Sequence, residues 1–398
     1  MTQKLMTNDS LDISSQRRFT SMVALNIVST LAQIGQFAMG SMLLPIALEA
    51  KKASPTFIGF TSAIFWLGMF TGLLVAGKIT RVLGYRNTVV VGLLMGVVSF
   101  ILLPMLDWHW WALPAALIGF GTGLRWIANE TWLYQLAPEN ARGRIVGIHE
   151  TLIGLASIIG PLIIVALGAI KPHAYWVAAS MIAMSIPPLF FAATIPATLI
   201  SQNTTTTTPK RNGAILKMTM LFMSFGGLIA GLGGWMEASV LALLPIYNAD
   251  IGLTSQHTAW LLTILGVGLM LFQFPIGWLA DHKGVTWTSK FCVLIALTAT
   301  LFTIIFGYQF YAMAIAMFLF GGFSGGLLTL GIIWATQHSK GAELTNNIRQ
   351  VSVTYTLLSA MGPLVTGFIV NHTSSNSLFW QQLVVILVLA VVLIKHKV

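Results

Sequence analysis

Charged residues are scarce in this sequence. Of 398 residues only 8% are Asp, Glu, Lys or Arg, whereas 56% are hydrophobic and the mean hydropathy is +0.83. A soluble globular protein carries about 25% charged residues. The chain therefore has too little polar surface for a soluble protein, and we expect an integral membrane protein embedded in a lipid bilayer.

Cysteine is nearly absent as well. The single residue of this type, Cys292, excludes an internal disulfide and indicates a buried apolar side chain. No Walker A loop is present, which excludes direct drive by ATP. The pattern Gly119-x-Gly-x-Gly lies in an apolar segment with no preceding strand, so it is not a dinucleotide fingerprint. The histidines show no zinc-ligand spacing. We predict neither an enzyme nor a metal or cofactor site.

Positive charge exceeds negative charge, with a net charge of +10. The basic residues are spread over many short links, and no run is dense enough to bind nucleic acid. This spread suits a protein whose orientation in the membrane is set by Lys and Arg in its loops.

Long apolar runs fill most of the chain. A spanning helix needs about 20 mostly apolar residues. Twelve such segments are predicted, at 20–46, 56–80, 88–106, 112–136, 145–169, 175–196, 215–246, 258–280, 288–307, 311–336, 347–370 and 378–394.

A polar stretch in the middle of the chain, which contains five consecutive threonines, divides these segments into two sets of six. Residues 1–20 are polar and are followed by a run of spanning length, so they do not form a cleavable signal. We predict four regions: a cytoplasmic tail at 1–18, a six-helix bundle at 19–196, a cytoplasmic linker at 197–213 and a second six-helix bundle at 214–398.

Most of the 21 Lys and Arg residues fall on one side of this predicted topology, and only Lys51, Lys52 and Lys171 fall on the other. The side rich in positive charge is expected to be the cytoplasm. Both termini would then be cytoplasmic. The compact length and short loops indicate a prokaryotic inner membrane.

The two halves repeat each other. Leu43-Leu44-Pro45-Ile46 recurs as Leu243-Leu244-Pro245-Ile246, and Gly160-Pro161 recurs as Gly362-Pro363. A parallel repeat of six helices implies a pseudo-two-fold axis along the membrane normal. The substrate site of such a protein is expected at the interface of the halves, near the midplane.

Two loop motifs make a family resemblance specific. The sequence Gly277-Trp-Leu-Ala-Asp281-His-Lys-Gly284 is similar to the loop motif of the major facilitator superfamily, and Gly77-Lys-Ile-Thr-Arg81-Val-Leu-Gly84 is its diverged first copy. Gly160-Pro161 is similar to the Gly-Pro of the antiporter motif of that family. The resemblance covers all twelve segments. It implies an all-α integral membrane fold of two pseudo-symmetric six-helix bundles, and a monomer.

The resemblance also implies a gate. In the family, the acidic residue of the loop motif faces the start of a helix in the other half, where a carboxylate complements the positive helix end. Two cytoplasmic latches are therefore expected, one joining Asp281 to Arg142 or Arg144 and one joining Arg81 to Glu343. The alternative is that these charges are solvated and serve only orientation.

Two normally charged residues, Arg125 and Glu130, lie inside the fourth apolar segment. A charge at the bilayer centre costs about 2.5–3.5 kcal/mol on insertion scales, so such residues are candidates for function. Histidine and buried carboxylates can exchange protons in the physiological range. We predict Glu130 as the proton-coupling residue, His149 and Glu150 as relays, and Arg125 as a partner that switches between Glu130 and a substrate anion. The alternative is a permanently paired structural cluster.

In the family, segments 1, 4, 7 and 10 line the central cavity. Polar and aromatic residues on these segments are the substrate-binding candidates: Asn26, Gln33, Gln36, Arg125, Asn129, Trp132, Trp235, Glu237 and Trp334. A free Arg125 would favour an acidic or zwitterionic substrate, whereas an unpaired Glu237 would favour a cation. The aromatic side chains can equally serve as packing.

Three functions remain open. The first is a secondary active transporter that moves a small organic solute by alternating access, coupled to protons in either direction. The second is a transporter of an amphipathic or lipid-like molecule. The third is a receptor or assembly protein that has the transporter fold and does not transport; the ionisable residues in the cavity segments argue against it.

Overall fold

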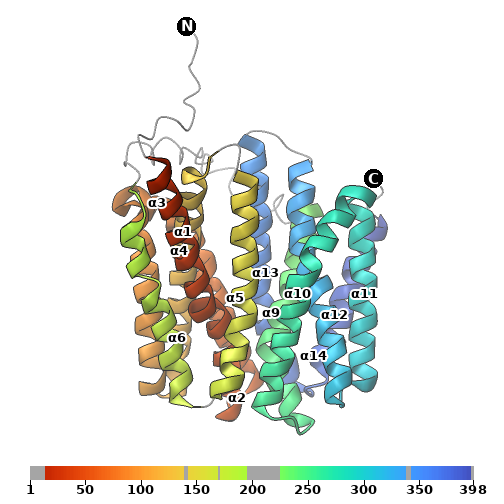
Figure 1. Ribbon diagram of the computed structural model, residues 1–398. Coiled ribbons are helices and arrows are strands. Elements are labelled where there is room, and N and C mark those ends of the chain that lie inside the picture. Colours follow the sequence, from red (N-terminus) through yellow and green to blue (C-terminus); the bar gives the residue numbers. More distant parts are fainter. Residues whose placement is uncertain (1–13, 139–141, 169–170, 195–224, 338–341, 396–398) are drawn as a thin grey trace, which may run out of the picture.

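The computed structural model describes residues 14–138, 142–168, 171–194, 225–337 and 342–395 (Figure 1). Within these ranges the regular structure is helical, with no strand. The helices of the first half are α1 (Ser15–Ala32), the π-helix η2 (Gln33–Met39), α2 (Gly40–Ala50), α3 (Pro55–Leu102), the short η3 (Leu103–Met105) and η4 (Trp108–Trp110), α4 (Ala112–Leu136), α5 (Arg142–Leu167), α6 (Pro172–Met184) and η6 (Pro187–Phe191). The helices of the second half are α9 (Phe225–Asp250), α10 (Ser255–Lys283), α11 (Val285–Phe306), α12 (Phe310–Gln337), α13 (Ala342–His372) and α14 (Ser377–Lys395).

Ten of the described helical segments are long and apolar enough to cross a membrane. The all-α membrane fold predicted from the sequence is therefore confirmed, while the number of twelve spans stays a prediction. Some boundaries differ from the sequence expectation. The first span is longer, because α1, η2 and α2 follow one another from Ser15 to Ala50 without a break. The predicted tail up to residue 13 and the linker 197–213 lie outside the described residues.

The sequence repeat is accompanied by matching backbone geometry at the last glycine of each loop motif. The second and third predicted segments form two helices within α3, which meet at a kink at Gly84, where φ is 76°. Gly284, between α10 and α11, has φ 84°. Positive φ is available to glycine at little cost. The last glycine of each loop motif therefore allows the chain to turn directly from one span into the next.

Each half also contains the same close helix contact. A methyl group added at Gly119 of α4 would lie 1.9 Å from the backbone oxygen of Phe65 on α3. The equivalent position, Gly321 of α12, would place it 2.2 Å from the oxygen of Leu265 on α10. Small residues let helices in a membrane approach this closely. The glycine-rich run around Gly119 therefore serves packing, and it fixes the position of the side chains that follow it on α4.

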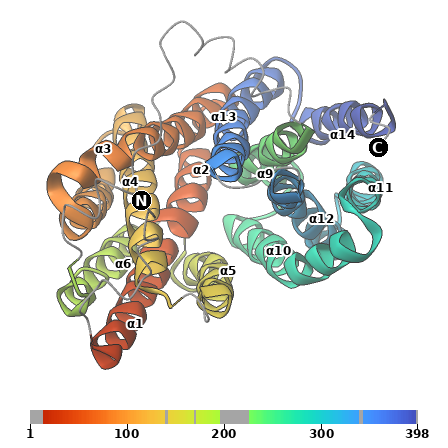
Figure 2. The ribbon, with the colours of Figure 1, turned by 90° about the horizontal axis from the view of Figure 1, so that it is seen from above.

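Seen along the helix axes, α1 to α6 lie on one side and α9 to α14 on the other (Figure 2). We call the end where α1 begins the terminal side, and the end where α2 meets α3 the far side. At the far side the halves touch closely: a Cβ at Gly59 of α3 would lie 2.2 Å from the oxygen of Pro363 on α13. Nearer the middle, Gly154 of α5 faces Met270 of α10.

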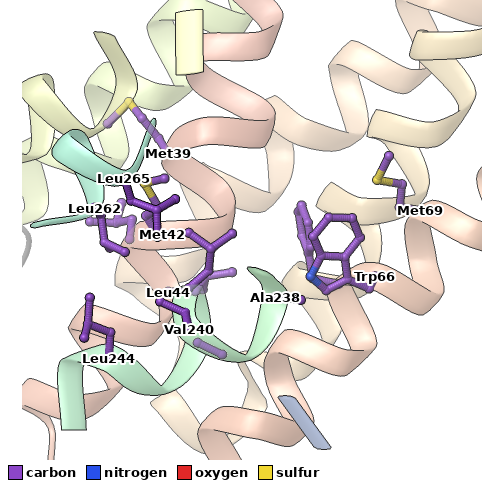
Figure 3. Close-up of a cluster of buried hydrophobic side chains, with 14 of the residues drawn as sticks. Met39, Met42, Leu44, Trp66, Met69, Ala238, Val240, Leu244, Leu262 and Leu265 are labelled. Carbon is purple, nitrogen blue, oxygen red and sulfur yellow. The ribbon is translucent and has the colours of Figure 1, made fainter. Parts of the chain in front are cut away.

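Apolar side chains close the far half of this interface. Met42 and Leu44 of α2 face Leu262 and Leu265 of α10 and side chains of α9, as Figure 3 shows. A cavity of about 10 Å³ remains there, lined by Ser41, Trp66 and Ala242 among others. That space holds about one water molecule. The conformation described is therefore sealed on the far side.

Candidate functional site

Glu130 lies in the second half of α4, and 21% of its side chain is exposed. Its Oε1 atom accepts a hydrogen bond from the indole N–H of Trp126, one helical turn earlier. The same oxygen lies 3.7 Å from Nε2 of His149 on α5. A carboxylate in the inner part of the bundle thus faces a histidine that belongs to the next helix.

His149 is fully buried, and its two ring nitrogens have different surroundings. Nδ1 lies 2.9 Å from Oδ1 of Asn26 on α1, and the Asn26 amide nitrogen donates to the Met22 carbonyl, which fixes the orientation of the amide. Since Oδ1 can only accept, Nδ1 is the donor. Nε2 has no hydrogen-bond partner. In the neutral ring Nε2 therefore presents a lone pair toward Glu130. Glu150, the next residue, is exposed.

Arg125 is 1% exposed and forms hydrogen bonds across the contact between α4 and the first span. Its Nε donates to Oε1 of Gln36 at 3.2 Å, and one terminal nitrogen donates to Oε1 of Gln33 at 3.4 Å. The Gln36 amide in turn donates to the Gly92 carbonyl of α3 at 2.8 Å. The predicted partnership of Arg125 with Glu130 is not seen as an ion pair within 4.0 Å among the described residues.

Glu237 lies midway along α9 and is half-buried. The hydroxyl of Tyr355 on α13 donates to its Oε2 at 3.0 Å. The ion pairs among the described residues are Asp107 with His109 and Glu130 with His149. Within that part of the chain, the Glu237 carboxylate therefore has a hydroxyl partner and no basic one.

A continuous row of aromatic rings joins the two carboxylates. Phe37 contacts Trp126 with ring centroids 6.4 Å apart and Trp66 at 5.7 Å. Trp66 contacts Tyr355 at 6.1 Å. All three contacts are edge-to-face, the arrangement that the charge distribution of aromatic rings favours. We call these four residues the aromatic row; it runs from the N-terminal half to the C-terminal half.

Other candidates from the sequence occupy packing positions. Asn129 donates to Ser29 and to the Leu25 carbonyl. Trp132 is fully buried, stacks on Tyr85 and donates to the Ala193 carbonyl at 3.0 Å. These contacts hold α4 to α1, α3 and the end of the first half, so we leave both residues out of the proposed binding site.

Trp235 and Trp334 are half-buried. The Trp235 indole nitrogen is buried without a hydrogen-bond partner, and the Trp334 ring packs against Phe225 at 5.9 Å. Neither belongs to the aromatic row.

Of the predicted latch pairings, only that of Asp281 with Arg144 falls on side chains that the structure describes. Asp281, Arg81 and Arg144 are all exposed. Asp281 and Arg144 form no ion pair within 4.0 Å. The side chains of Arg142 and Glu343 lie outside the described residues, so the pairing of Arg81 with Glu343 stays a prediction.

Sequence reasoning did not select Phe37, Trp66, Trp126 or Tyr355 for the site. Two of them, Trp66 and Tyr355, lie on spans that the family resemblance does not place around the cavity. The signal that points to them is their contact with a carboxylate or with one another, and this signal appears only when five helical elements are placed together.

Two repeated bundles of apolar helices that contain ionisable side chains are typical of a membrane transporter. The model of the Major Facilitator Superfamily matches residues 25–237 and 223–397, and the chain belongs to that family. The two matches fall on the two halves of the chain. Members of this family are transporters and not enzymes, as the sequence predicts.

Curated relatives are similar over most of their length. The MFS-type transporter YcaD of Escherichia fergusonii is 24% identical over 348 residues, covering 86% of this chain and 87% of the relative. An MFS-type transporter of Yersinia pestis is 25% identical over 351 residues, with the same coverage.

Solved structures share the fold at low sequence identity. A mutant of the nucleoside transporter NupG has a TM-score of 0.81 at 12% identity. The alignment covers 94% of this chain and 100% of the NupG chain. A D-xylose-proton symporter has a TM-score of 0.73 at 13% identity, covering 95% and 98%. At such identities the likeness shows the fold alone.

Proposed function

We propose that this protein is a secondary active transporter that couples the movement of a proton to that of a small organic solute by alternating access. The observation that carries the proposal is the pair formed by Glu130 and His149. A carboxylate and an imidazole, 3.7 Å apart in the interior of a transporter, can exchange one proton between them.

The geometry gives each group a role. Asn26 holds His149 through Nδ1, so the free Nε2 is the atom that takes a proton from Glu130. Trp126 donates to the Glu130 oxygen and stabilises the deprotonated form. Glu150 is exposed at the next position of α5, where it can pass the proton to water. The proton on Glu130 thereby alters the charge at one end of the aromatic row.

Alternating access requires that the seal move from one side to the other. The far side is sealed by α2, α9 and α10, while Arg81, Arg144 and Asp281 on the terminal side are exposed. We propose that the terminal side is the cytoplasm of a prokaryote, because most Lys and Arg residues of the chain fall there. The described conformation is then the inward-facing one of a monomer.

Proton flux in proteoliposomes tests the proposal. Vesicles with an internal pH dye receive a panel of organic anions, sugars, amphiphiles and cations. We expect one class to cause a pH change that is lost in Glu130→Gln. Glu49→Gln, at the far end of α2, is the matched control and should behave as the parent protein. Solute movement without a pH change in the parent would exclude proton coupling.

A further inference from the structure

The aromatic row is an unusual feature for a site that was expected to bind through Arg125. Its ends are carboxylates, Glu130 and Glu237, and its centre is four rings in edge-to-face contact. Apart from Trp66, which is 2% exposed, the rings are half-buried and so keep accessible surface. Such a surface offers ring faces and negative charge to a ligand, and few neutral hydrogen-bonding groups.

Positive charge is kept away from this surface. Arg125 is 1% exposed and its donors are taken by Gln33 and Gln36. The imidazole of His149 is fully buried behind Glu130. An anion at the row would therefore meet two carboxylates and no accessible guanidinium.

The Glu237 carboxylate has no basic partner among the described residues. Among the described residues, its hydrogen-bond partner is the hydroxyl of Tyr355. A carboxylate inside a membrane protein is normally paired with a basic group or faces a ligand path. The faces of Phe37 and Tyr355 also attract cations, because the ring quadrupole is negative above the ring.

We propose that the aromatic row binds an organic cation that carries a flat apolar group. Glu237 takes the cationic group, Phe37 contacts the flat group, and Tyr355 orients the Glu237 carboxylate. The site is the substrate site of the transporter proposed above, so the inference rests on that function. It selects the cation among the substrate classes that the sequence left open.

Three small probes separate charge from shape. Phenyltrimethylammonium has both a ring and a positive charge, tetramethylammonium has the charge alone, and benzenesulfonate has a ring with a negative charge. Binding of tritiated phenyltrimethylammonium to the purified full chain in detergent is measured by scintillation proximity, with the other two as competitors. We expect saturable binding, competition by tetramethylammonium that is weaker by about tenfold, and no competition by benzenesulfonate.

Substitutions then assign the contacts. Glu237→Gln should weaken binding by about tenfold or more, and Glu237→Asp, which keeps the charge, by a smaller factor. Phe37→Leu should weaken binding by several-fold through the lost ring face. Glu49→Gln is the control and should bind as the parent does. If Glu237→Gln does not yield folded protein, Glu237→Asp and Phe37→Leu decide the question.

The inference is overturned if phenyltrimethylammonium does not bind saturably, if benzenesulfonate competes as well as tetramethylammonium, or if the Glu237 and Phe37 variants bind like the parent. The assay uses no proton gradient, so its result is independent of coupling. Cation binding without any coupled pH change in vesicles would exclude proton coupling and leave this site in place. A coupled pH change with a different solute class would support proton coupling and exclude the cation site.

Discussion

At the scale of single residues, the buried guanidinium of Arg125 is a charged group that needs hydrogen-bond partners inside the first half. Its charge is solvated by two glutamine side chains that stand on the π-helical turn η2. Neutral acceptors satisfy the hydrogen bonds of a charged group without removing its charge. The turn, α4 and α3 are thereby tied together at one point, through Gln36 and the Gly92 carbonyl.

This arrangement predicts that Gln36→Leu destabilises the protein strongly. The change removes the acceptor of the Arg125 Nε. Leaving a buried donor unsatisfied costs about 1–3 kcal/mol, and more when the group is charged. Thermal unfolding followed by circular dichroism should show a clear fall in midpoint. Gln16→Leu, at an exposed position of α1, is the matched control and should leave the midpoint close to that of the parent. An equal midpoint for both variants would contradict the role given to Gln36.

The residue scale is also where prediction from sequence succeeded in part. Glu130 and His149 were found because ionisable groups are conspicuous in apolar segments, and the structure brings them together. The direction of Arg125 could not be found, because the sequence does not tell whether a buried guanidinium meets a carboxylate or an amide. Phe37 and Tyr355 were missed because aromatic residues are common in membrane helices and carry no distinct local signal.

At the scale of helices, glycine sets how closely α3 and α4 pack. The residues after Gly119 on α4 include Arg125, Trp126 and Glu130, so their positions depend on this contact. A Cβ at residue 119 would overlap the Phe65 backbone oxygen, and backbone cannot move aside as a flexible side chain can.

We therefore predict that Gly119→Ala lowers the thermal midpoint, since overpacking costs about 1–3 kcal/mol. It should also reduce proton-coupled transport, because α4 must shift. Gly77→Ala on α3 is the control, as nothing lies within 4 Å of the added methyl group. Thermal unfolding and the vesicle assay on the same two variants test this. The packing argument fails if the Gly119 variant is as stable and active as the Gly77 variant.

The repetition of helix contacts in the two halves could be predicted from the sequence, whereas the detailed form of the helices could not. Glycines at matching positions in the halves pointed to matching contacts, and both Gly119 and Gly321 make them. The π-helical form of η2 could not be predicted from the hydrophobic pattern of the sequence, because one extra residue in a turn does not change its apolar composition. The two segments expected in the region of α3 correspond to two helices that meet at the kink at Gly84.

At the scale of the whole molecule, the seal on the far side is the feature that must open during transport. It combines the close backbone contact of Gly59 with Pro363 and the apolar contact of α2 with α9 and α10. Both contacts join the two halves. A side chain that forces α3 away from α13 should therefore shift the protein toward a conformation that is open on this side.

The lone native cysteine makes this shift measurable. Cys292 is fully buried, so an introduced cysteine can be labelled with little background. Ser41 is 9% exposed and lines the small cavity in the seal. We predict that Ser41→Cys reacts slowly with a membrane-impermeant maleimide added from the far side. Ser54→Cys, at an exposed position of that side, should react fast and serves as the reference.

Adding Gly59→Leu to Ser41→Cys should raise the labelling rate several-fold, because the new side chain cannot fit against the Pro363 carbonyl while the seal is closed. Gly77→Leu, which meets open space, should leave the rate unchanged. If Ser41→Cys already reacts as fast as Ser54→Cys without a second change, the far side is open in the membrane and the inward-facing assignment is wrong. If Gly59→Leu leaves the rate low, α3 and α13 do not control the seal, and the contact of α2 with α9 and α10 alone keeps it closed.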